Sequence, residues 1–164
     1  MQNKSAASDQ RAFLIPLQLM GEERPLYCLL SQNQINEVLA PRTTYPAPLS
    51  PAYLQGCISF FGDLVPVIDL SALFGGTPQG KARQLVVIRT GEKDTWSEGH
   101  LKLALKCSAP VQTIKLTAAE LQSGLKEEEF PAHLERAELI KSFYTMQGSG
   151  VFLVDFNRIV RGAV

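Results

Sequence analysis

The sequence predicts a mostly β protein arranged as two small barrels that share an interface. Short runs of apolar and β-branched residues alternate with glycine, proline and polar turn residues along most of the chain. The runs add up to about nine strands, one group before and one after the glycine pair at 75 and 76. A chain of 164 residues can build a core without metal or disulfide, so we expect one domain over 13–160 after a flexible tail at 1–12.

The first two strand-like runs are Phe13–Leu19 and Leu26–Leu30. They flank a polar turn at 21–25, and this order predicts a hairpin. Pro16 has no N–H group to donate to a neighbouring strand, which places the first run at a sheet edge.

A short helix is expected next. Ser31 and Gln34 have the spacing of a capping box, and Ile35–Leu39 carries apolar residues at helical spacing before Pro41. Three further prolines follow up to residue 51. Because proline fixes φ and removes donors, the stretch 41–51 is predicted to be a stiff extended connection.

Two runs around Phe61-Gly62-Asp63 predict a second hairpin. They are Leu54–Phe60 and Leu64–Asp69, and the glycine between them can adopt the positive φ of a tight turn. The segment Ser71–Phe74 predicts a single helical turn, because a glycine pair follows it.

The second half of the chain continues the same pattern. The continuous apolar run Leu85–Ile88 predicts a strand covered on both faces, whereas Leu101–Cys107 alternates as in a strand with one buried face. Val111–Leu116 predicts a further strand. A last hairpin is expected from Leu139–Met146 and Val151–Val154.

Three shorter segments complete the prediction. Thr117 and Glu120 have capping-box spacing before a short helix that ends at Gly124. The charged stretch Lys126–Glu138 is typical of a surface connection. Asp155 is placed to cap a closing helical turn.

Charge and hydropathy limit the kinds of partner. The chain has 16 Lys and Arg against 16 Asp and Glu, and proteins that bind phosphate backbones need uncompensated cations. We therefore expect no nucleic-acid partner. No run approaches the roughly 18 consecutive apolar residues of a membrane helix, and residues 1–10 lack a signal-peptide core. A soluble, cytoplasmic protein without membrane insertion is expected.

The cysteines and histidines predict no metal site. Cys28, Cys57 and Cys107 lie far apart at apolar positions and have no CxxC spacing, so buried free thiols are expected. His100 and His133 are predicted to be surface residues.

No catalytic pattern is found either. Gly148-Ser149-Gly150 lacks the flanking residues of a nucleophile elbow, and Gly75-Gly76 lacks the lysine of a phosphate loop, so both are predicted turns. The acidic run at 127–129 is typical of a solvated face. The sequence therefore predicts a protein that is not an enzyme and has no cofactor.

The single tryptophan leaves two interpretations open. Trp96 lies in a polar loop, where a large aromatic side chain can anchor a protein interface. The same ring can instead fold back over the rim of a barrel.

One segment resembles a known family. Residues 46–75 contain a proline-rich connection, Gly56, the turn glycine Gly62, the strand Pro66-Val67-Ile68-Asp69-Leu70 and a closing Gly75. This order resembles the signature of the CheW-like chemotaxis coupling family, with looser similarity over residues 13–160. The resemblance implies a mostly β fold of two small five-stranded β-barrel lobes, with a shared hydrophobic core and a few short helices.

The resemblance also implies a function and a contact surface. Family members are non-catalytic adaptors that join the signalling tips of chemoreceptors to a CheA-type histidine kinase, so we expect this role, in a standard or a divergent chemosensory system. Partner contacts are expected at Glu37, Phe61, Gly62 and Asp63. The family usually carries Arg at the position of Phe61 and an acidic residue near Lys106. If that Arg forms an ion pair with the acidic residue that the family carries at the position of Glu37, then Glu37 must be exposed or paired with another residue in this chain.

The strand pattern by itself supports an alternative hypothesis, a barrel that binds a small ligand or an oligonucleotide. The balanced charge counts against nucleic acid. Affinity for single-stranded nucleic acid that weakens steeply with salt would favour this alternative.

Overall fold

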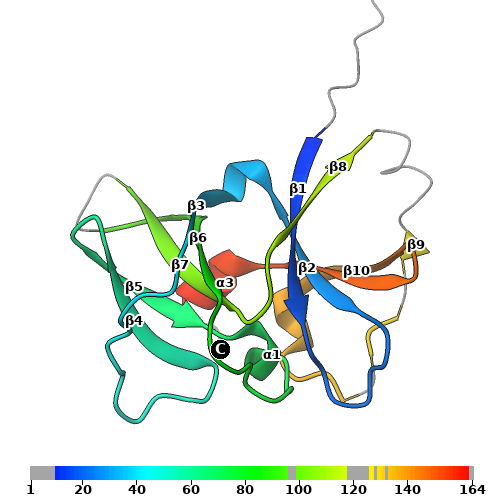
Figure 1. The fold of residues 1–164 in the computed structure, drawn as a ribbon, viewed down its shortest axis with the longest axis horizontal. Coiled ribbons are helices and arrows are strands. Elements are labelled where there is room, and N and C mark those ends of the chain that lie inside the picture. Colours follow the sequence, from blue (N-terminus) through cyan, green and yellow to red (C-terminus); the bar gives the residue numbers. More distant parts are fainter. Residues whose placement is uncertain (1–9, 96–98, 118–125, 128, 132, 163–164) are drawn as a thin grey trace, which may run out of the picture.

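Two sheets packed around a common core make up the protein (Figure 1). The computed structural model describes residues 10–95, 99–117, 126–127, 129–131 and 133–162. Trp96 and the helix expected after Thr117 lie outside these residues. The first sheet contains β1 (Gln10–Leu17), β2 (Leu26–Ser31), β8 (Gln112–Leu116), β9 (Lys126–Glu127), β10 (Ile140–Met146) and β11 (Ser149–Val154). The second contains β3 (Ile35–Leu39), β4 (Leu54–Phe60), β5 (Asp63–Ile68), β6 (Gln84–Lys93) and β7 (His100–Cys107).

Both sheets are built on the same plan. Their strand orders are β8-β1-β2-β11-β10-β9 and β3-β6-β7-β5-β4. In each, two antiparallel hairpins are joined by one parallel pair, β2 with β11 and β5 with β7. The mostly β, two-lobed fold is thus confirmed, although the ladders formed by the described residues do not close into complete barrels.

The expected division at the glycine pair is wrong. The hairpin β4–β5 comes before residues 75 and 76 and the hairpin β6–β7 after them, yet both belong to the second sheet. The first sheet likewise combines the two ends of the chain. Strand pairing between distant segments is decided by which apolar faces can be buried together, and this is not visible in the order of the runs.

The two sheets also share a local structural repeat. The hairpin β4–β5 turns at Phe61-Gly62 and the hairpin β10–β11 at Gln147-Gly148, and all four residues have positive φ, from 47° to 84°. This is the geometry of a type I′ turn. Each hairpin leads to an aspartate, Asp69 or Asp155, whose side chain accepts a hydrogen bond from the N–H three residues later. These caps start α1 (Leu70–Leu73) and α3 (Phe156–Val160). The cap at Asp155 was predicted, whereas at α1 only the helical turn was predicted.

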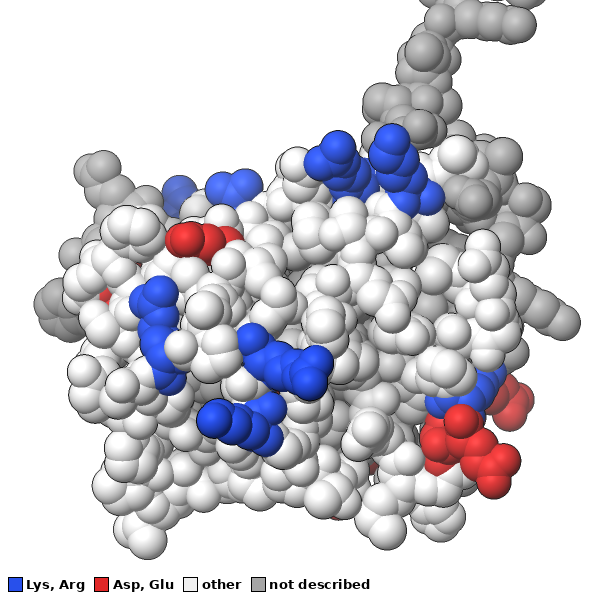
Figure 2. Space-filling model, viewed as in Figure 1, with Lys and Arg blue, Asp and Glu red and all other residues white. Residues whose placement is uncertain are grey.

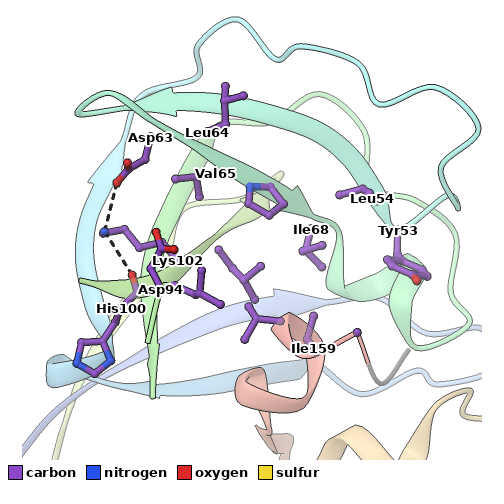
Figure 3. A pocket seen from close by; sticks show the side chains of 15 residues that line it. Tyr53, Leu54, Asp63, Leu64, Val65, Ile68, Asp94, His100, Lys102 and Ile159 are labelled. Atoms are coloured by element: carbon purple, nitrogen blue, oxygen red, sulfur yellow. Dashed lines mark hydrogen bonds and ion pairs between the residues drawn. The ribbon is translucent and has the colours of Figure 1, made fainter. Parts of the chain in front are cut away.

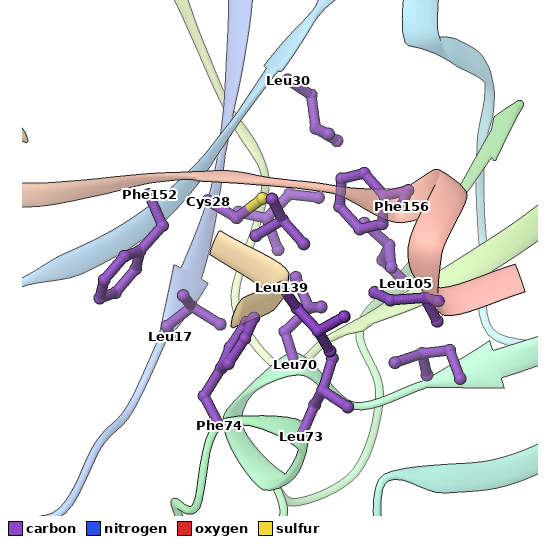
Figure 4. Packing of buried hydrophobic residues seen from close by; sticks show 14 of the residues in the cluster. Leu17, Cys28, Leu30, Leu70, Leu73, Phe74, Leu105, Leu139, Phe152 and Phe156 are labelled. Atoms are coloured by element: carbon purple, nitrogen blue, oxygen red, sulfur yellow. The ribbon is translucent and has the colours of Figure 1, made fainter. Parts of the chain in front are cut away.

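The largest apolar cluster spans both sheets. Figure 4 shows Leu17, Cys28 and Leu30 of the first sheet packed with Leu105 of the second and with side chains of α1 and α3. A smaller cluster lies within the second lobe, with these buried members: Leu39, Ile58, Phe60, Val65, Val67, Leu85, Val87 and Ala104. The shared hydrophobic core is therefore confirmed.

Strand β6 shows why its sequence is continuously apolar. Val86 and Ile88 are buried in the shared core, whereas Leu85 and Val87 are buried in the cluster of the second lobe. The prediction of a strand covered on both faces is confirmed.

The helix expected over Ile35–Leu39 is wrong. The capping box of Ser31 and Gln34 forms, but it starts only a 3₁₀ turn (η1, Gln32–Gln34), and the chain then becomes β3. Val38 pairs with Val86 of β6. Five residues are too few to separate a helical period from an alternating one, and the open edge of β6 decides between them.

Smaller differences concern the ends of strands. β1 begins at Gln10, within the stretch expected to be a tail, and it pairs with β8 as well as with β2. The pairing with β8 ends at Leu14, so only the last part of the strand, which contains Pro16, is a sheet edge. Lys126 and Glu127 pair with β10 rather than forming part of an irregular connection. A second 3₁₀ turn, η2 (Ala137–Leu139), precedes β10.

Candidate functional site

The tip of the hairpin β4–β5 holds three of the four residues expected to contact a partner. Phe60 and Asp63 close the turn as a cross-strand pair, with Phe61 and Gly62 between them. Type I′ turns favour Asn or Asp followed by Gly, because both central residues need positive φ. Phe61 has φ 47° and a bulky side chain, so its backbone is held in a region that costs about 1 kcal/mol or more.

The ring of Phe61 is not used to fill the core. Its relative exposure is 87%, whereas the neighbouring Phe60 is only 5% exposed. The two rings meet edge to face with their centroids 4.7 Å apart. An aromatic side chain that is both exposed and carried on an unfavourable backbone is suited to contact another molecule.

Asp63, directly after the turn, reaches across to β7. Its Oδ2 lies 3.7 Å from Nζ of Lys102, and the same ammonium group donates a hydrogen bond to the carbonyl oxygen of His100. The carboxylate is more than half exposed, so this ion pair contributes little to stability. It does fix the direction of two charged side chains beside the hairpin tip.

An apolar groove opens behind this ion pair. β5 and β7 pair only at Val67 with Ala104 and at Ile68 with Leu105, and they separate towards the hairpin tip, where Pro66 cannot donate to a ladder. The space between them is about 480 Å³ and ends against Ile159 of α3 (Figure 3). Its lining is mostly apolar, with these residues at its charged or polar rim: Asp63, Asp94, His100 and Lys102.

Glu37 is not part of this arrangement. It is exposed on β3, beside a bulge and opposite Val87 of β6, and no hydrogen bond or ion pair of its side chain is found among the described residues. β3 and β4 are the two outer strands of the second sheet. The structure therefore brings Phe61, Gly62 and Asp63 together and leaves Glu37 as a separate, solvated charge, which fits its missing Arg partner.

A buried polar cluster at the junction of the lobes was not predicted from the sequence. Asp69 is fully buried, and its Oδ2 accepts a hydrogen bond of 2.7 Å from the N–H of Gln79. The Gln79 side chain donates to Ser71 and to the Pro16 carbonyl and accepts two hydrogen bonds from Ser108. Gln79 thus links β1 of the first sheet to the end of β7 in the second. Only the polar residues close to Asp69 in sequence could have hinted at this cluster.

The cysteines are structural. Burial raises the pKa of Cys28, with a smaller contribution from Cys107. Burial raises the pKa of Cys107 to about 12, helped by the Asp69 carboxylate. Both thiols therefore stay protonated and unreactive at neutral pH. Cys57 is half-buried rather than a full core residue.

Metal-ligating side chains are not clustered in the described part of the chain. No three His, Cys, Asp or Glu side chains are grouped there as metal ligands. No helix within the described residues has the length and apolar character needed to cross a bilayer. His100 and His133 are exposed, as predicted.

Comparison with known proteins agrees with this architecture. The family model of the CheW-like domain matches residues 17–164. The chain belongs to the CheW-like domain family. As a member of this family it is a non-catalytic CheW-like scaffold of chemotaxis signalling, and the family implies partners among chemotaxis proteins.

The fold of this CheW-like chain also resembles a solved structure. The crystal structure of the scaffolding protein TtCheW from Thermoanaerobacter tengcongensis superposes with a TM-score of 0.64, over 94% of this chain and 89% of that one. The two sequences are 14% identical, so the likeness concerns the fold alone. No curated protein matches the chain.

Proposed function

We propose that this CheW-like protein couples the signalling tips of chemoreceptors to a CheA-type histidine kinase in the cytoplasm, and that the hairpin tip Phe61-Gly62-Asp63 contacts one of these partners. The observation that carries the proposal is Phe61, an exposed aromatic side chain held at positive φ. A sequence selected only for folding would place Asn or Gly there.

The apolar groove beside the tip supports the same surface. Interfaces between proteins combine an apolar centre with a polar rim, and the groove has both. Leu64, next to Asp63, adds a second exposed apolar side chain with 71% relative exposure. Leu64 also lines the groove, as do Asp63 and Lys102 at its rim, so the groove extends to within a few residues of Phe61. Glu37, on the opposite outer strand, is proposed as a second and independent contact.

The test is co-purification from a native extract with the immobilised full chain, followed by identification of the captured proteins. The wild type is expected to capture a histidine kinase, a receptor or both. Phe61→Asn is expected to fail to capture at least one of these partners. Gln147→Asn introduces Asn at the equivalent turn position of the other sheet and should leave capture unchanged.

A third variant addresses partner choice. Phe61→Arg restores the charge that the family usually has at this position, and stronger capture of a receptor would show that Phe61 tunes the choice of partner. Repeated recovery of neither a kinase nor a receptor by the wild type would contradict the proposed function.

A further inference from the structure

Although the net charge of the chain is zero, its acidic and basic residues are unevenly distributed along the sequence. No Asp or Glu occurs in the segments 38–62, 70–91 and 99–119. The cations of these three segments are Arg42, Lys81, Arg83, Arg89, Lys102, Lys106 and Lys115. Residues 38–62, 70–91 and 99–107 belong to the second sheet or its connections, whereas Lys115 lies on β8 of the first sheet. Cations of the second lobe thus lie in segments that carry no acidic residue, although the lobe has acidic residues elsewhere.

The fold brings two of these cations to one small cavity, and two more are chain neighbours of a residue that lines it. Arg42 follows β3 and Lys106 lies near the end of β7, and both line a cavity of about 200 Å³. Ala82 also lines it, with Lys81 and Arg83 as its exposed neighbours in the chain. We call Arg42, Lys81, Arg83 and Lys106 the basic pocket.

The charges of the basic pocket are largely uncompensated. Lys106 lies 3.8 Å from the buried Asp69, and within the described part of the chain Arg42 donates a hydrogen bond to one backbone carbonyl, that of Ser59. Among the described residues, no ion pair is formed by Arg42, Lys81 or Arg83. Figure 2 shows blue side chains close together over the second lobe, with a red side chain between them and further blue side chains at the upper edge.

The cavity itself suits a carboxylate on a short aliphatic stem. Its remaining polar lining, Thr44 and Gln55, can take part in hydrogen bonds, and its other walls are apolar: Pro41, Val67, Ala82 and Leu85. A polynucleotide would need cations along a track of phosphates, whereas Arg42 and Lys106 line a single cavity. The pocket shares no lining residue with the groove between β5 and β7.

We propose that the basic pocket is a second docking surface, which binds an acidic segment of a protein partner by placing an Asp or Glu carboxylate between Arg42 and Lys106. Lys81 and Arg83 attract neighbouring acidic side chains and raise the rate of association. This surface goes beyond the hairpin tip and does not depend on it.

The test uses the full chain and a short fluorescein-labelled peptide of alternating Glu and Gly, measured by fluorescence anisotropy. Binding is expected, and it should weaken as salt is raised. The double variant Arg42→Glu/Arg83→Glu should bind about tenfold more weakly or worse. Lys141→Glu, an exposed charge reversal on β10 of the other sheet, serves as the matched control and should leave the affinity within about twofold.

Three outcomes would overturn the proposal. They are no binding of the Glu peptide at low salt, equal losses in the double variant and in Lys141→Glu, and tighter binding of an oligothymidylate than of the peptide. Thermal unfolding of each variant confirms that it is folded. Because the probe is neither a kinase nor a receptor, a negative result here leaves the proposed coupling function standing, and a failed co-purification leaves this surface standing.

Discussion

Nζ of Lys106 lies 3.8 Å from Oδ2 of Asp69, whose side chain is fully buried at the junction of the two lobes. The ammonium group also donates a 2.8 Å hydrogen bond to the Gln79 carbonyl oxygen. Burying a carboxylate without a nearby cation or hydrogen bonds lowers the stability of the fold, so Lys106 has a structural role beside Asp69. It stabilises the aspartate that caps α1.

Replacing Lys106 with Met should therefore lower the free energy of unfolding by about 3 kcal/mol, because the buried Asp69 side chain would lose the cation beside it. Urea unfolding measures the loss. In an Asp69→Asn background, where the cap can still accept a hydrogen bond but carries no charge, Lys106→Met should cost less than half as much. An equal cost in both backgrounds would mean that the lysine acts through packing alone.

Asn substitutions at the two type I′ turns should distinguish an effect on partner binding from an effect on stability. Phe61→Asn and Gln147→Asn each create the Asn-Gly pair that this turn favours, so each should keep or raise the free energy of unfolding, by up to about 1 kcal/mol. Thermal and urea unfolding measure this change. A loss of more than about 1 kcal/mol for Phe61→Asn alone would instead assign its ring a role in stabilising Phe60.

Gly56 should tolerate substitution far less well than Gly62. A methyl group on Gly56 would overlap the carbonyl oxygen of Tyr45, and Gly56 also has a positive φ of 122°. Gly62 has a positive φ of 84°, but the space around it is open. We expect Gly56→Ala to cost about 3 kcal/mol or more of unfolding free energy and Gly62→Ala about 1 kcal/mol. Urea unfolding of both variants checks the ranking, and equal costs would contradict the close approach of Tyr45 to β4.

The buried thiols predict a loss of stability at alkaline pH. The pKa of Cys107 rises from 9.0 to about 12 on folding, so the folded state holds a proton that the unfolded chain releases. This contribution is complete below about pH 9 and is lost as the pH rises towards 12. Urea unfolding at about pH 8 and about pH 10.5 should show a decline that is smaller, by about 1 kcal/mol or more, in Cys107→Ala. The same decline in both proteins would argue against a protonated thiol.

Much of the fold could be predicted from local sequence. The turn at Phe61-Gly62, the cap at Asp155 and the doubly covered strand at 85–88 all depend on residues close together in the chain, and each is found as expected. The segment 46–75 was sufficient to indicate the family. These features are local because turn geometry and capping are set within a few residues.

The tertiary structure alone decided how the strands are shared between the sheets, that Ile35–Leu39 is a strand, and that Glu37 stands apart from Phe61. It also decided the partner of Lys106 and the gathering of Arg42 and Lys106 around one cavity. Each of these depends on contacts between residues far apart in sequence. Such contacts are selected by the burial of whole apolar faces and by the need of buried charges for partners, so no short window of sequence contains them.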